Sequence, residues 1–73
     1  MKLFVYYVKS GMDVFNHVER VCIKKKENKN TLIIKFIDKT KDEEIFLNEI
    51  ESAFLVEIVG KNGECKEYFR YEK

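Results

Sequence analysis

Residues 54–71 read FLVEIVGKNGECKEYFRY, and this stretch decides the fold. Apolar and charged residues alternate on both sides of Asn62-Gly63. Asn-Gly in that setting predicts a β-hairpin, because both positions of a two-residue type I′ turn need positive φ. A turn there would place Val56 opposite Phe69 and Phe54 opposite Tyr71. One face would then be mainly apolar and the other would pair opposite charges, so the sequence predicts two antiparallel strands.

A second hairpin is predicted over residues 18–39 by the same logic. Two β-rich segments, 18–26 and 31–39, flank Glu27-Asn28-Lys29-Asn30. A turn centred on Asn28-Lys29 would place Ile23 opposite Ile34 and Val21 opposite Phe36 on one face. The other face is mixed and is predicted to be partly exposed; it carries Arg20, Cys22, Lys24, Ile33, Lys35 and Ile37.

The rest of the chain also favours strands. Residues 2–8 are almost all apolar or aromatic, which predicts a strand buried on both faces. Ser10-Gly11 predicts a turn, and Asn16-His17 predicts a bend or bulge before the next strand. Residues 40–55 allow two interpretations. A helix-capping pattern at 40–43 would start one short helix around 42–52, whereas a strand at 44–48 with a tight turn through Ile50 agrees better with the hairpin that follows.

Together these segments predict a mainly β protein with a single small domain, residues 1–73. We expect a small antiparallel barrel or roll of five to six short strands in hairpin order. A sheet must cover one face, and this chain offers no helical layer large enough to do so. Closure would cover that face and also remove open strand edges.

Cysteine usage and hydropathy predict a cytoplasmic protein. The two cysteines, Cys22 and Cys65, cannot form the disulfide framework of a small secreted domain, so we expect reduced thiols. The apolar run at residues 3–8 is shorter than the core of a signal peptide. No stretch approaches the roughly 20 apolar residues of a membrane span.

The residues needed for catalysis or metal binding are scarce, so we expect a protein that is not an enzyme and holds no metal or cofactor. His17 is the only histidine, and an odd spacing in an extended strand would direct Cys22 to the opposite face. No Cys-x-x-Cys pattern accompanies the two cysteines. The consecutive acids at 42–44 are typical of a solvated turn rather than of a strained acid–base pair.

The charges are unevenly distributed although the formal net charge is only +1. Residues 20–41 carry a net charge of +6, and residues 42–57 carry −6. The two segments could neutralise each other within the fold or form two poles on its surface.

Two kinds of binding follow from these features. We favour a protein partner, with a homo-oligomer as one form of it, contacted through Asp42, Glu43, Glu44, Glu49, Glu51 and Tyr68. The alternative is nucleic acid, bound by a basic hairpin and surface aromatics: Arg20, Lys24, Lys25, Lys26, Lys29, Lys35, Tyr6 and Tyr7. The sequence pI of about 7.7 is lower than is typical of a nucleic-acid-binding domain.

Residue usage suggests a source. Lys outnumbers Arg twelve to two, and Ile and Asn are frequent, which is the bias of A/T-rich coding sequences. A low-GC bacterium, or a phage or mobile element living in one, would produce it. No family motif is recognisable. An accessory protein that inhibits or modulates a host protein is the hypothesis that fits this source.

Overall fold

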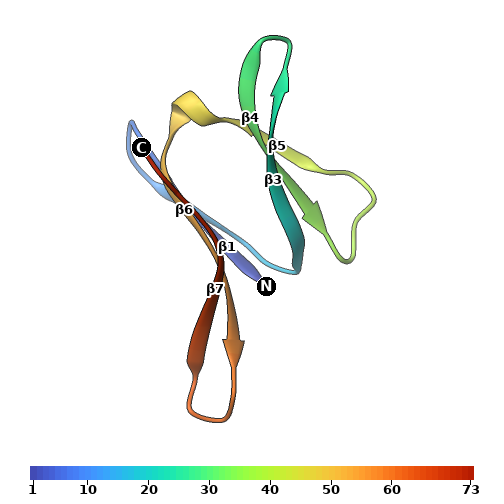
Figure 1. Ribbon diagram of the computed structural model, residues 1–73, viewed down its shortest axis with the longest axis vertical. Helices are drawn as coiled ribbons and strands as arrows, with labels where there is room; N and C mark the ends of the chain where they lie inside the picture. Colours follow the sequence, from blue (N-terminus) through green and yellow to red (C-terminus); the bar gives the residue numbers. More distant parts are fainter.

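A computed structural model describes all 73 residues and shows a mainly β protein with seven strands in two antiparallel sheets (Figure 1). The single turn of 3-10 helix, η1, spans Leu47–Glu49. The strands are β1 (Lys2–Tyr7), β2 (Met12–Phe15), β3 (Val18–Lys26), β4 (Lys29–Phe36), β5 (Glu43–Phe46), β6 (Ile50–Val59) and β7 (Glu64–Glu72). The protein therefore has more strands than the five to six that were expected.

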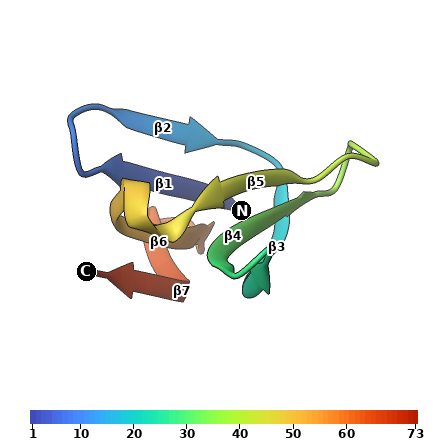
Figure 2. The same cartoon turned by 90° about the horizontal axis from the view of Figure 1, so that it is seen from above.

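The two sheets contain β2-β1-β6-β7 and β3-β4-β5 in these orders, and a closed barrel is not found. Strict hairpin order also fails, because β1 pairs with β6, which lies near the other end of the chain. Figure 2 shows the four strands of the first sheet side by side, with β3, β4 and β5 to one side of them. We call the two layers the four-stranded and the three-stranded sheet.

The core lies between the inner faces of the two sheets. It is formed by alternate residues of the central strands and by residues at the corners: Leu3, Val5, Val18, Leu32, Ile34, Phe36, Ile50, Ala53 and Leu55. Thr31 is the one buried polar residue, and its hydroxyl donates a hydrogen bond to the carbonyl oxygen of Lys29 at 3.1 Å. Every buried side-chain polar atom has a partner.

The chain crosses between the sheets at two corners. At the first, His17 has a φ of 59°, and the amide of Val18 donates to the carbonyl oxygen of Met1 at 2.9 Å. This confirms the bend predicted at Asn16-His17. At the second, η1 reverses the chain between β5 and β6, and Val8 N–H donates to the Glu49 carbonyl oxygen at 2.9 Å. The strand interpretation of residues 44–48 is confirmed for β5, and no α-helix forms there.

The β3–β4 hairpin is confirmed, but its predicted register is wrong by two residues. The turn is Glu27-Asn28, with φ values of 52° and 65°, so Lys26 pairs with Lys29. Ile23 therefore faces Leu32 and Val21 faces Ile34. An even shift leaves each side chain on its predicted face, because side chains alternate with a period of two. The observed two-residue loop has positive φ at both positions, the pattern of a type I′ turn, whose twist matches that of the flanking strands.

The β6–β7 hairpin is also confirmed with a different turn. Positive φ occurs at Gly60 and Gly63 and not at Asn62, so the loop has four residues and Val59 pairs with Glu64. A register shift then leaves Tyr68 as an extra residue between the pairs Val56–Glu67 and Leu55–Phe69. Residues after the bulge change face.

The bulge divides the apolar face predicted for this hairpin. Phe69 and Tyr71 pair with Leu55 and Ala53 and pack against the core. Phe54 instead faces Arg70 and lies on the other side of the sheet. The burial of β1 on both faces is likewise incorrect: Leu3 and Val5 are buried, while the alternate residues are partly open.

Candidate binding surface

The outer face of the four-stranded sheet carries six apolar side chains from three adjacent strands. The register places Phe4 between Val14 and Phe54, and Tyr6 beside Met12. Leu3, Val5 and Leu55 point into the core, so the residues that alternate with them point outward. We call this set the apolar face; it consists of Phe4, Tyr6, Met12, Val14, Phe54 and Val56.

No other element of the chain covers the apolar face, since the three-stranded sheet packs against the opposite side. Tyr6, Met12 and Val14 remain 41%, 48% and 40% exposed. Tyr6 and Phe54 contact each other edge to face, with ring centroids 6.1 Å apart. β1 is hydrogen-bonded on both sides, so these aromatic rings lie on a rigid support.

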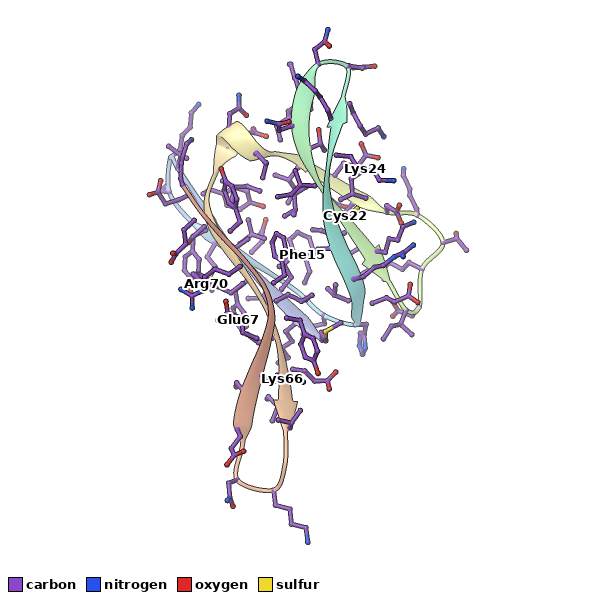
Figure 3. The ribbon with its side chains drawn as sticks, viewed as in Figure 1. Phe15, Cys22, Lys24, Lys66, Glu67 and Arg70 are labelled. Atoms are coloured by element: carbon purple, nitrogen blue, oxygen red, sulfur yellow. The ribbon has the colours of Figure 1, made fainter.

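Charged residues of β7 border the apolar face. The Arg70 guanidinium lies 4.8 Å from the centre of the Phe54 ring. Its Nη2 donates to Glu67 Oε2 at 2.9 Å and its Nη1 donates to Glu72 Oε1 at 3.2 Å. The bulge at Tyr68 makes this possible, because it brings residues 67 and 70 to the same side of the sheet. Figure 3 shows Glu67 and Arg70 beside each other on β7.

The ion pair shifts the pKa values of both partners. The hydrogen bond from Arg70 lowers the pKa of the Glu67 carboxyl, and the carboxylate in turn raises the pKa of Arg70. The guanidinium is therefore neutralised by two carboxylates while it covers an aromatic ring. This edge is polar but carries no excess of positive charge.

A shallow pocket of about 440 Å³ continues the apolar face toward the projecting end of the β6–β7 hairpin. It shares Phe4 and Val56 with the apolar face. Its other lining residues are Met1, Lys2, Asn16, His17, Ile37, Glu57, Ile58 and Cys65. Ile37 and Ile58 are among the most exposed large apolar side chains of the molecule. The apolar surface thus continues along β6 to Ile58 and reaches Ile37, which follows β4.

The outer face of the three-stranded sheet contains the basic residues predicted from the sequence except Lys25, which lies on the same face of β3 as Ile23. Lys26 Nζ donates to Glu44 Oε2 at 2.8 Å, and Lys35 Nζ donates to Asp42 Oδ2 at 3.1 Å. The hydrogen bond with Glu44 raises the pKa of Lys26. Lys29 Nζ lies 4.8 Å from the centre of the Phe46 ring. The basic and acidic segments therefore neutralise each other in part within the fold.

The acidic residues predicted to bind protein do not form one surface. Glu44 and Asp42 are ion-paired, and Glu43 is exposed on β5. Glu49 lies in η1 and Glu51 in β6. Tyr68 lies at the bulge of β7 on the other sheet and is 49% exposed.

The residues predicted to bind nucleic acid lie on both sides of the molecule. Lys24, Lys25, Lys26 and Lys29 gather at the β3–β4 hairpin, with Arg20 and Lys35 farther along the same strands. Tyr6 belongs to the apolar face of the other sheet. Tyr7 points inward, where its hydroxyl donates to Asp13 Oδ2 at 2.7 Å. The pKa of Tyr7 is raised mainly by burial of the hydroxyl and, to a smaller extent, by this hydrogen bond. In Figure 3 Lys24 and Arg70 lie on opposite sides of Phe15.

Most residues of the apolar face were not predicted as site residues, although β2 carries a signal for them. In β2, Met12 and Val14 lie on the outer face, yet only the turn before this segment and the bend after it were predicted. In β1, the absence of polar residues concealed that one of its two faces lies open. Both faces of β1 are mainly apolar, so alternation alone could not identify which of its faces is covered.

The two thiols lie apart. Cys22 in β3 and Cys65 in β7 belong to different sheets and form no disulfide. No three His, Cys, Asp or Glu side chains lie close enough together to hold a metal ion. None of the helical structure has the length or apolar character needed to cross a membrane.

Comparisons with protein families, with curated proteins and with solved structures find no match for this chain. Function is therefore inferred from the surfaces of the molecule itself.

Proposed function

We propose that this protein is a non-enzymatic binding module that acts through protein–protein interaction, with the apolar face as its contact surface. The observation that carries the proposal is a set of six contiguous apolar side chains on a sheet face that no other element covers. Exposed apolar patches bordered by polar residues mark interaction sites in small proteins. A role as a modulator of a host protein is one form that this activity would take.

The arrangement of the face fits protein binding in two further ways. Aromatic and methionine side chains are enriched at the centres of protein interfaces, and this face presents Phe4, Tyr6, Phe54 and Met12. Arg70 and its two carboxylates form a polar border along one side. A rigid apolar centre with a polar border is the general anatomy of a protein interface.

The positions of the charges favour protein over nucleic acid. A single-stranded nucleic acid would need stacking aromatics and phosphate-binding cations on one surface. Here Tyr6 and most lysines of the β3–β4 hairpin lie on the outer faces of different sheets, and these outer faces point away from each other. In addition, Lys26 and Lys35 are already paired with acidic residues.

The test is affinity capture from the lysate of a low-GC bacterium, with and without nuclease, using three forms of the tagged protein. The first is the wild type. The second, Met12→Lys with Val14→Lys, adds two charges to the apolar face on an edge strand, where lysine is well tolerated. The control, Ile23→Lys with Phe46→Lys, adds the same charge at two side chains of similar exposure elsewhere, 43% and 41%. Circular dichroism of each form establishes that it folds.

We expect the wild type and the control to retain a protein after nuclease treatment, and the apolar-face variant to lose it. Capture of the same protein by all three forms would contradict the choice of surface. Recovery that disappears with nuclease, and that is lost when Lys24 and Lys25 are replaced by Glu, would establish nucleic-acid binding instead.

A further inference from the structure

We propose that the apolar face binds a second copy of this chain, so that two four-stranded sheets pack face to face in a symmetric homodimer. The proposal rests on the apolar face being a protein-contact surface and specifies the partner. It differs from the proposed function in its consequence, because a dimer forms in the pure protein without any other molecule.

The exposed surface area supports the need for a partner. A monomeric protein of 8.8 kDa is expected to expose about 4,800 Å². This chain exposes 5390 Å². The excess of about 600 Å² approaches the roughly 800 Å² that each partner contributes to an interface of standard size. The molecule is also flat, with extents of 43, 28 and 17 Å, so a second layer on the sheet would make it more compact.

The apolar face is complementary to itself. In a two-fold dimer the same patch is used by both copies. β1 runs through the middle of the apolar face, with β2 on one side and β6 on the other. A two-fold axis along β1 would lay β2 of one copy over β6 of its partner. The smaller Val14 would then meet the large ring of Phe54, an alternation that allows side chains to interdigitate.

The charges of the molecule are compatible with this packing. With the axis along β1, the β7 strand lies at the border of the contact, where Glu67, Arg70 and Glu72 would remain in water. Arg70 is already paired with both carboxylates, so no isolated charge would be buried. The formal net charge of +1 causes little repulsion between copies.

The first experiment measures the mass of the purified protein by analytical ultracentrifugation over micromolar to millimolar concentrations. We expect the wild type to reach twice the chain mass of 8.8 kDa. In the Met12→Lys and Val14→Lys variant four charges would enter the interface, and we expect a dissociation constant about 100-fold higher or more. The control variant, Ile23→Lys with Phe46→Lys, should dimerise like the wild type.

A second measurement keeps the proposal testable if the apolar-face variant fails to fold. Residues of β1 lie near the proposed two-fold axis, so each of them would approach the same residue of the second copy. With Cys22 and Cys65 replaced by Ser, Tyr6→Cys should be joined into dimers by a short bis-maleimide, whereas Ile23→Cys should not.

A wild-type protein that stays at 8.8 kDa at every concentration would overturn the homodimer. Equal dimerisation of the wild type and both variants would place the interface elsewhere and would also overturn it. A monomeric wild type that still captures another protein through the apolar face would leave the proposed function intact. The two proposals can therefore fail separately.

Discussion

Arg70 illustrates how a single side chain joins several parts of this surface. Its guanidinium covers the Phe54 ring and bonds to carboxylates on both sides along β7. Exposed ion pairs of this kind contribute little to stability by themselves. The effect of Arg70 is mainly to fix the orientation of its neighbours, and this can be observed at a single carboxylate.

We predict that Glu67 titrates below the ordinary glutamate pKa of 4.5, because Arg70 hydrogen-bonds to its ionised form. The folded pKa is lower than the unfolded pKa. The contribution of Glu67 to stability is therefore fully present above about pH 4.5 and is lost as the pH falls through the folded pKa. An NMR titration of the side-chain carboxyl carbon measures this pKa, and Arg70→Gln should raise it. An unchanged titration in that variant would contradict the prediction.

The turn at Glu27-Asn28 gives a second prediction at the scale of the residue. Both residues have positive φ, which glutamate tolerates poorly. Replacing the pair with the preferred type I′ sequence, by Glu27→Asn with Asn28→Gly, should raise the free energy of unfolding by about 1 kcal/mol. Urea denaturation measures the change. Lys39→Asn, outside the turn, should have a much smaller effect, and a loss of stability in the double variant would refute the turn assignment.

At the scale of the element, the sequence predicts faces better than registers. The faces predicted for the β3–β4 hairpin were correct, although the turn lies one residue before its expected place and the register differs by two. Hydrophobic alternation has a period of two and cannot distinguish registers that differ by two. In the β6–β7 hairpin the bulge at Tyr68 breaks this alternation, so the faces of Phe69 and Tyr71 could not be derived from their spacing to Phe54.

The paired residues Ile23 and Leu32 provide a test of how the β3–β4 hairpin packs against the other sheet. They lie opposite each other and differ in burial: Leu32 is in the core, and Ile23 is 43% exposed. Leu32→Ala should lower the free energy of unfolding by about 2–5 kcal/mol, because it leaves a cavity between the sheets. Ile23→Ala should lower the free energy of unfolding by less than about 1 kcal/mol, because this side chain is partly exposed. Chemical denaturation measures the loss of stability in each variant. Similar losses for Leu32→Ala and Ile23→Ala would contradict the structure.

At the scale of the whole molecule, the sequence predicted a mainly β protein but not its division into two sheets. The pairing of β1 with β6 joins distant segments that no local pattern connects. The candidate surface escaped prediction for the same reason, because it exists only where β2, β1 and β6 lie side by side. The neutralisation of the acidic segment by the basic one was one of two possibilities that the charge pattern left open.

If the chain dimerises through its apolar face, its thermal stability must depend on concentration. A partner that binds only the folded state shifts the unfolding equilibrium by mass action. Scanning calorimetry should show a Tm that rises with protein concentration for the wild type. The Met12→Lys and Val14→Lys variant should have a Tm that does not change with concentration. A concentration-independent Tm in the wild type would argue against the dimer.

The position of β1 between β2 and β6 has a consequence for synthesis of the protein in the cell. Leu3 pairs with Leu55, so the first strand cannot complete its sheet until most of the chain has left the ribosome. Until then its apolar residues can pair only with the short strand β2. Long-range pairing of this kind is slow and leaves strand edges open to aggregation. During synthesis β1 therefore keeps one edge unpaired until β6 has been made.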